Sequence, residues 1–462
     1  MRLLATALLG GQANLDIFAT ATKDTYPDLI TLNLLERAHS IAPELIAIRR
    51  DLHRHPELAF KEVRTAGIVA QEMEALGCDV RTGVGRTGVV ADLDAGHGPV
   101  IALRADMDAL PILEENKHDY VSTTPGVMHA CGHDGHVAGL IGAARLLALE
   151  RDAGLLPPGR IRFLFQPSEE STDEDGLSGA MRMVSEGAMQ GVDAVVGLHL
   201  GGPLPSGKLF FAPGPIMAGA EEIQVEVRGK SSHAALPSAG VDALVLAAQG
   251  IVTVQQAVSR GLSPMESGVV TFGRIEGGTA TNVIADRVTL EGTIRFFSED
   301  VRERLHRNLK ASFKMLETLG AQVTVDIGPG YLPVINDARI TKCVQAAALD
   351  LVGEDNVFPI QPMTFAEDFS FLAREAPGTF FWLGAALPQP RMHHEATFDI
   401  DESALPVGAA ALVPSAIRTT MNPPPPIFPA SGFTTARAMD TAIAASTALP
   451  PSCMMFAPTL LA

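Results

Sequence analysis

This sequence has few cysteines, fewer basic than acidic residues and no long apolar run. Four cysteines occur in 462 residues, far apart and without a CxxC pair, so a disulfide-stapled scaffold is excluded and a reducing compartment is the default. No apolar run is long enough to cross a bilayer. Lys and Arg number 35 against 53 Asp and Glu, a formal charge of -18, which argues against a nucleic-acid partner because phosphates would be repelled.

The sequence also lacks a GxSxG nucleophile motif. What it contains instead is residues 129–136, HACGHDGH, with three histidines, a cysteine and an aspartate in eight positions. Thiolate and imidazole are the strongest neutral-pH ligands for zinc-like metals, and the two glycines let neighbouring side chains converge. A nucleophilic pair of Cys131 and His133 is the competing hydrolase class, but it leaves the other histidines and the carboxylates described below without a role.

Metal-type residues also follow three predicted apolar strands. Asp106 and Asp108 follow 100–103, Glu169 and Glu170 follow 160–166, and His199 follows 192–197. The carboxyl ends of strands in open α/β sheets are where ligand sites form. A two-metal hydrolytic site needs several ligands and a general base, and adjacent glutamates suit a division between metal binding and proton transfer. Together with residues 129–136, these strand ends predict a hydrolytic metal site.

The chain is too long for one simple core, so we expect more than one domain. Strand and helix patterns alternate over 35–216 and again over 331–420, and we assign both to one catalytic domain. Between them, 217–330 shows a β-α-β-β-α-β order, which predicts an inserted ferredoxin-like domain. Residues 1–34 are expected to be an extension and 421–462 a disordered tail with few charges and no periodicity.

Several motifs, in matching order from about residue 40 to 415, resemble the M20 metallopeptidase family. Its nearest branch is the amidohydrolases of N-acyl amino acids, including hippurate and auxin-conjugate hydrolases. The motifs are RDLHRHPE at 50–57, RADMDALP at 104–111, HACGHDGH at 129–136, QPSEE at 166–170, GLH at 197–199, SHAA at 232–235, TNVI at 281–284, GTIR at 292–295 and FDIDE at 398–402.

The resemblance implies an α/β protein: a di-metal catalytic domain with a central, mostly parallel sheet, and an inserted α+β lid that forms a homodimer. It implies Glu169 as the general base, Asp106 as a residue that orients a metal ligand, and His233 as a donor to the oxyanion in the partner's site. Asn282 and Arg295 would hold the substrate carboxylate. The implied metal ligands are Cys131, His133, Glu170, His199 and His394. The usual HxP before Phe398 is absent, so His393 stays open as the alternative to His394.

The predicted activity is metal-dependent hydrolysis of the amide bond of N-acyl amino acids. Two divalent ions are expected, manganese or zinc first and cobalt or nickel as further candidates. A dipeptidase or aminopeptidase is the alternative enzyme, and a catalytically silent dimeric binding protein is the alternative of another class. We expect a cytoplasmic protein that acts on small molecules, without a nucleic-acid or membrane partner; secretion stays open, although the apolar run at residues 1–10 is short for a signal peptide.

Overall fold

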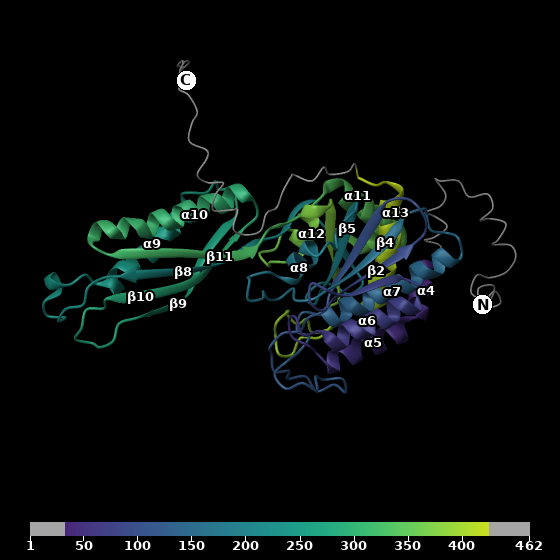
Figure 1. Ribbon diagram of the computed structural model, residues 1–462, viewed down its shortest axis with the longest axis horizontal. Coiled ribbons are helices and arrows are strands. Elements are labelled where there is room, and N and C mark those ends of the chain that lie inside the picture. The colour runs from purple at the N-terminus through teal and green to yellow at the C-terminus, as the bar shows by residue number, and fades with distance from the viewer. Residues whose placement is uncertain (1–32, 425–462) are drawn as a thin grey trace, which may run out of the picture. The chain divides into compact units, whose positions relative to one another are not determined.

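The computed structural model describes residues 33–424 (Figure 1). The predicted extension and tail therefore lie almost entirely outside the described residues. No helix within the described range is both long enough and apolar enough to cross a membrane.

An eight-stranded sheet forms the centre of the larger part of the fold, in the order β1-β2-β4-β3-β5-β14-β6-β13. The four central strands, β4, β3, β5 and β14, run parallel, which confirms the predicted mostly parallel centre. The bounds are β1 Asp79–Val84, β2 Gly88–Asp94, β3 Val100–Asp106, β4 Arg160–Gln166, β5 Ala194–Gly201, β6 Leu209–Phe211, β13 Val357–Pro359 and β14 Gly378–Gly384. The four central strands are almost entirely buried, as is typical of parallel strands covered on both faces.

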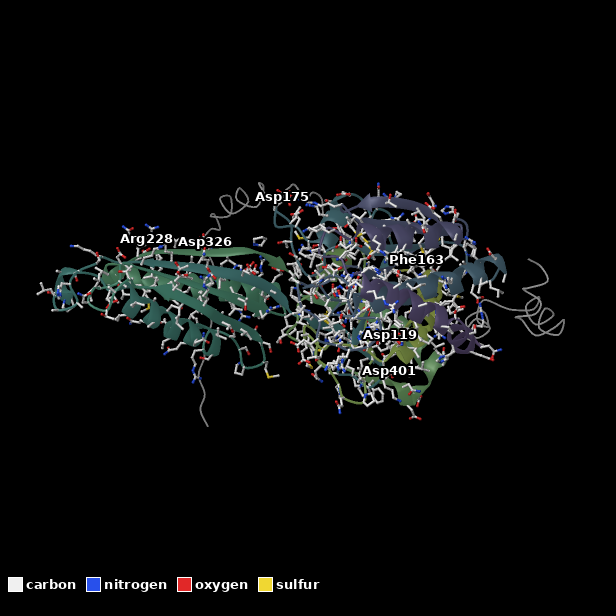
Figure 2. All side chains as sticks on the ribbon, turned by 90° about the horizontal axis from the view of Figure 1, so that it is seen from below. Asp119, Phe163, Asp175, Arg228, Asp326 and Asp401 are labelled. Atoms are coloured by element: carbon white, nitrogen blue, oxygen red, sulfur yellow. The ribbon has the colours of Figure 1, made fainter. Side chains whose placement is uncertain are left out.

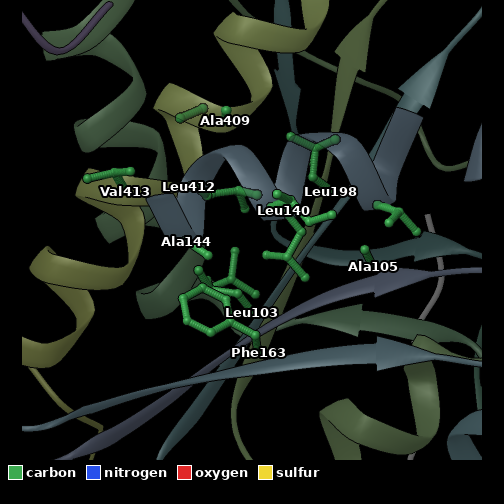
Figure 3. Close-up of a cluster of buried hydrophobic side chains, with 14 of the residues drawn as sticks. Leu103, Ala105, Leu140, Ala144, Phe163, Leu198, Ala409, Leu412 and Val413 are labelled. Atoms are coloured by element: carbon green, nitrogen blue, oxygen red, sulfur yellow. The ribbon is translucent and has the colours of Figure 1, made fainter. Parts of the chain in front are cut away.

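Alternate residues of the central strands enter two separate cores. Leu103 and Phe163 pack with Leu140 and Leu412 on one face (Figure 3), whereas Leu164 belongs to the core on the other face. The helices of the first core are α4 Leu34–Ser40, α5 Ala42–Arg54, α6 Val63–Ala75, α7 His133–Asp152, α11 Ala338–Val352 and α13 Leu405–Met421; the second core uses α8 Gly179–Ser185 and α12 Phe369–Glu375. The period of two in a strand produces this division.

The second sheet is antiparallel and has four strands in the order β11-β8-β10-β9. Its elements are β8 Gly219–Arg228, α9 Ala243–Ser259, β9 Gly268–Gly277, β10 Arg287–Phe296, α10 Glu299–Lys314 and β11 Gln322–Tyr331. The predicted β-α-β-β-α-β order is therefore confirmed. Inward residues of β8, such as Val225, pack with the helices in a core of their own, while Arg228 and Asp326 lie exposed on the strands (Figure 2).

The two sheets are joined by a short two-stranded ribbon, β7 Gly214–Met217 paired with β12 Val334–Asn336. We keep 217–330 as the proposed limits of the inserted domain. Short 3₁₀ turns at Pro237–Ala239, Met315–Leu319, Glu354–Asn356 and Glu402–Ala404 complete the fold.

Two local features differ from the sequence-based expectation. The helix α4 begins at Leu34, the last residue of the expected extension, and buries its Leu34 and Ala38. Strand β5 continues to Gly201, so His199 lies inside the strand rather than after it.

Candidate active site

A glycine in the left-handed backbone conformation sets the position of the first two candidate ligands. Gly132 caps α7 with a φ of +92°, a conformation that costs glycine little. The chain turns there, so that Cys131 precedes the helix and His133 begins it. Both side chains are buried and lie in one group with His199 of β5.

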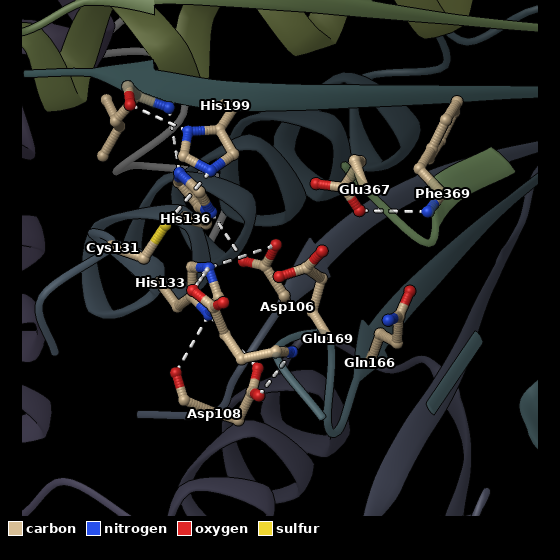
Figure 4. A network of polar contacts seen from close by, with 12 residues as sticks. Asp106, Asp108, Cys131, His133, His136, Gln166, Glu169, His199, Glu367 and Phe369 are labelled. Carbon is tan, nitrogen blue, oxygen red and sulfur yellow. Dashed lines mark hydrogen bonds and ion pairs between the residues drawn. The ribbon is translucent and has the colours of Figure 1, made fainter. Parts of the chain in front are cut away.

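The structure brings together all five predicted ligands (Figure 4 shows Cys131, His133 and His199). Cys131 Sγ lies 3.6 Å from His199 Nε2. Glu170 Oε1 lies 2.9 Å from His394 Nε2 and 4.0 Å from His133 Nε2. Cys131 also forms close groups both with His133 and His199 and with Glu170 and His394. A thiol with imidazoles and a carboxylate is a donor set suited to zinc-like divalent ions.

The hydrogen bonds of the two buried histidines fix which nitrogen faces the cluster. His199 Nδ1 donates to the Leu200 carbonyl at 2.8 Å, and His133 Nδ1 donates to the Asp108 carbonyl at 2.9 Å. In the neutral ring each Nε2 then carries a lone pair, as a ligand must. Within residues 33–424, His133 Nε2 is buried without a hydrogen-bond partner. That unpaired acceptor fits a metal ion.

His136 has a different arrangement, since both of its nitrogens are engaged. Its Nδ1 donates to Asp106 Oδ1 at 2.6 Å, and its Nε2 accepts the Leu200 N–H at 2.9 Å. We therefore leave it out of the ligand set. Asp106, expected to orient a ligand, binds His136 and lies 3.7 Å from the cluster-facing Nε2 of His133. The orienting contact to His133 comes from Asp108, to which sequence reasoning gave no role although it noted the residue at the strand end.

A strained turn after β4 presents the two glutamates. Ser168 has a φ of +44°, an uncommon conformation for serine that costs on the order of 1–3 kcal/mol. Glu169 is buried. Burial raises its pKa well above the usual range, and the nearby carboxylates of Glu367 and Glu170 add to the effect. No hydrogen bond from another described residue reaches the Glu169 carboxylate, so its oxygens are free to bind a water.

The structure separates the two C-terminal histidines. His394 has a φ of +67° and points its Nε2 at Glu170, whereas His393 Nε2 donates to the Leu200 carbonyl at 2.8 Å. The His393 nitrogen that would bind a metal is thus engaged with a backbone carbonyl. The geometry therefore favours His394 as the candidate ligand.

Three predicted site residues of the inserted domain are not brought to the cluster. His233 is exposed and its Nδ1 accepts the Ala235 N–H at 3.1 Å. Asn282 is exposed. Arg295 is half-buried, and burial lowers its pKa. Among residues 33–424, no polar contact joins any of them to the five candidate ligands.

Sequence reasoning missed a buried ion cluster on the ligand-bearing segments. Arg49, on α5, is fully buried and lies 2.8 Å from Asp134 and 2.7 Å from Asp399. Asp134 follows the candidate ligand His133, and Asp399 follows the loop that carries His394, so Arg49 ties both segments to one helix. The sequence signal for this cluster was Arg49 itself, a charged residue among the buried positions of α5.

The comparisons with known proteins identify the family of this chain. Peptidase family M20/M25/M40 matches residues 102–417. The chain is 39% identical over 393 residues to the N-acetyl-L-cysteine deacetylase of Bacillus subtilis, covering 84% of this chain and 90% of the deacetylase. It is 37% identical over 374 residues to the IAA-amino acid hydrolase ILR1-like 4 of Arabidopsis thaliana, covering 79% and 83% of the two chains.

Among solved structures, the YXEP protein of Bacillus subtilis, described as a dinuclear metal binding peptidase, matches with a TM-score of 0.72. The two share 32% identity, and the match covers 83% of this chain and 99% of that one. The present chain belongs to peptidase family M20. Within that family, its amidohydrolase relatives and its fold make it a metal-dependent hydrolase of linear amide bonds.

Proposed function

We propose that this protein hydrolyses the amide bond of N-acyl amino acids, releasing a carboxylic acid and a free amino acid. The observation that carries the proposal is the buried Glu169, whose carboxylate has no hydrogen bond to a described residue, directly beside the five candidate ligands. Relatives named for N-acetylcysteine and for IAA-amino acids support this substrate class.

Cys131, His133, Glu170, His199 and His394 would hold two divalent ions, for which manganese and zinc are the first candidates and cobalt and nickel further ones. Such ions lower the pKa of a bound water and polarise a scissile carbonyl. The chain supplies the proton transfers: Glu169 takes the proton of the attacking water and delivers it to the departing amine nitrogen. Asp108 holds the His133 ring through its Nδ1–H.

The inserted domain supplies the remaining groups in this proposal. Asn282 and Arg295 bind the substrate carboxylate, and His233 donates to the oxyanion of a second subunit's site. A homodimer is supported by apolar residues exposed on the domain, since Val245 and Val252 of α9 are 61% and 65% exposed and Ile275 of β9 is 53% exposed. Strand β9 is also an edge of its sheet, and such edges are open to pairing.

The test of the activity is release of free amine from a panel of N-acyl amino acids, measured with manganese, zinc, cobalt or nickel added to metal-free protein. We expect metal-dependent hydrolysis that Glu169→Gln lowers by at least about 10²-fold. Glu186→Gln, a glutamate outside the site, is the control. Faster cleavage of free than of N-acetylated dipeptides would indicate a dipeptidase or aminopeptidase instead. No hydrolysis of any substrate, with full metal loading, would indicate the silent binding protein.

The role of His233 is tested by mixing two inactive variants, His233→Ala and Glu169→Ala, under conditions in which subunits exchange. A mixed dimer has one site with an intact base and a histidine from its neighbour, so activity should return to no more than about half per mixed dimer. If the subunits exchange and no activity returns, His233 does not act across a dimer.

A further inference from the structure

Three consecutive residues of the turn that carries the glutamates each have a backbone group bonded to a side chain from elsewhere in the chain. The Ser168 N–H donates to Glu62 Oε1 at 2.9 Å. The Glu169 carbonyl accepts the Tyr331 hydroxyl at 2.6 Å. The Glu170 N–H donates to Asp108 Oδ2 at 3.0 Å. The turn also contains the positive φ of Ser168, and backbone strain of this kind persists only where the surroundings over-determine it.

The turn matters because it sends the two glutamates to different partners. Glu170 Oε1 meets His394 Nε2 at 2.9 Å, while the neighbouring Glu169 carboxylate stays free of hydrogen bonds from the described residues. A relaxed serine conformation would rotate both side chains relative to the strand end. The placement of Glu169 therefore depends on the contacts that keep Ser168 strained.

Glu62 is an unusual buried carboxylate. It lies just before α6, has no exposed surface, and forms no ion pair with any cation among residues 33–424. Its Oε1 accepts the N–H groups of Phe60 and Ser168, each at 2.9 Å, and its Oε2 accepts the Thr87 hydroxyl. Burying an unpaired carboxylate is costly, so its retention needs a reason other than stability, and the bond to the strained turn is one.

Tyr331 reaches the turn from the end of the smaller sheet, one residue beyond the proposed limits of the inserted domain. It is the last residue of β11, and its ring packs edge-on against Phe371 of α12 with 6.3 Å between centroids. Its hydroxyl thus connects the end of the smaller sheet to the backbone of the candidate base. Any shift of that strand end changes the bond to Glu169.

We propose that Glu62 and Tyr331 are positioning residues that hold the strained Ser168–Glu170 turn so that Glu169 faces the water and Glu170 faces the metals. The inference rests on the proposed function. Asp108 is set apart, because it also orients His133 and its loss would act in two ways. Tyr331 further makes the position of the base depend on the end of strand β11.

The test compares Tyr331→Phe and Glu62→Ala with the wild type in kcat, KM and metal content. Displacing a catalytic group by about 1 Å costs up to about 10²-fold. We expect kcat to fall ~10- to 100-fold in both variants, while KM stays within about two-fold and the metal content is retained. Glu62→Gln keeps an acceptor for the Ser168 N–H, so it should restore kcat to within about five-fold of the wild type.

Matched controls separate positioning from lost stability. Thr341→Val removes another buried hydroxyl, which donates to the Asp337 carbonyl at 2.7 Å, and Glu150→Ala removes another buried glutamate, paired with Arg37. Their melting temperatures should fall, with kcat near that of the wild type. The proposal is overturned if Tyr331→Phe and Glu62→Ala have the kcat of these controls, or if Glu62→Gln is no better than Glu62→Ala. If Glu62→Ala fails to fold, the kcat values of Tyr331→Phe and Glu62→Gln still test the positioning role.

Glu169→Gln is measured in parallel, because it distinguishes a failure of the proposed function from a failure of the positioning role. If that variant is fully active, the proposed function fails. If it is inactive and Tyr331→Phe has the wild-type kcat, the function stands and the positioning role falls.

Discussion

Replacing Arg104 with methionine should strongly destabilise the catalytic domain. The Arg104 guanidinium is fully buried and donates to Gln166 at 2.9 Å, Asp106 at 2.7 Å, Glu367 at 2.8 Å and Asp368 at 3.1 Å. Methionine keeps much of the apolar stem but leaves three buried carboxylates without their cation. Breaking a buried ion pair costs about 3–5 kcal/mol, and at roughly 2–4 °C per kcal/mol the melting temperature should fall by about 6–20 °C.

The assay is thermal unfolding of metal-free protein, with Arg64→Met as the matched control. Arg64 pairs with Asp51 at 2.9 Å, but both side chains are about 40% exposed, and exposed pairs contribute about 1 kcal/mol or less. Its melting temperature should fall by no more than about 4 °C. Arg104→Lys should lie between the two, because an ammonium cannot bridge three carboxylates as a guanidinium does.

Two further measurements examine the cause. Burial raises the pKa of both Glu367 and Asp368, while Arg104 lowers it. Without Arg104, these carboxyls keep a raised pKa in the folded state, so the folded protein loses stability as the pH rises through that pKa. The destabilisation by Arg104→Met should therefore be larger at about pH 9 than at about pH 6. Adding Glu367→Gln should recover part of the loss. If Arg104→Met melts within about 2 °C of Arg64→Met, the charge argument is wrong.

Three other predictions concern the metals and a buried acid. Chelation should abolish amide hydrolysis and lower the melting temperature, because a ligand that binds only the folded state stabilises it; re-addition of manganese or zinc should restore both. By elemental analysis, His394→Ala should lose metal while His393→Ala keeps it, and equal losses would contradict the assignment. Burial raises the pKa of Glu62 to about 7 from 4.5, so its contribution to stability falls as the pH rises through that range. Metal-free Glu62→Gln should therefore gain stability over the wild type from about pH 5 to pH 8, by at most about 3 kcal/mol, and a difference independent of pH would refute this.

The sequence alone determined the element order and the residue types at the strand ends. Apolar runs at 100–103 and 160–166 predicted buried strands; the structure extends the first to Val100–Asp106 and confirms the second at Arg160–Gln166. Since parallel strands end at one edge, Asp108 and Glu170 were expected to meet there. The β-α-β-β-α-β order of 217–330 followed from periods of two and 3.6 in the same way.

Only the tertiary structure decided how the side chains at that edge divide their contacts. His393 and His394 are adjacent in sequence, and the choice between them depends on which one faces Glu170, a residue 224 positions away. Likewise, the hydrogen bond of His133 Nδ1 goes to Asp108 rather than to Asp106, because ring rotations depend on packing that periodicity does not describe. The partners of Arg49 and Arg104 could not be predicted for the same reason: they come from distant segments, and a buried charge is explained only when its neighbours are known.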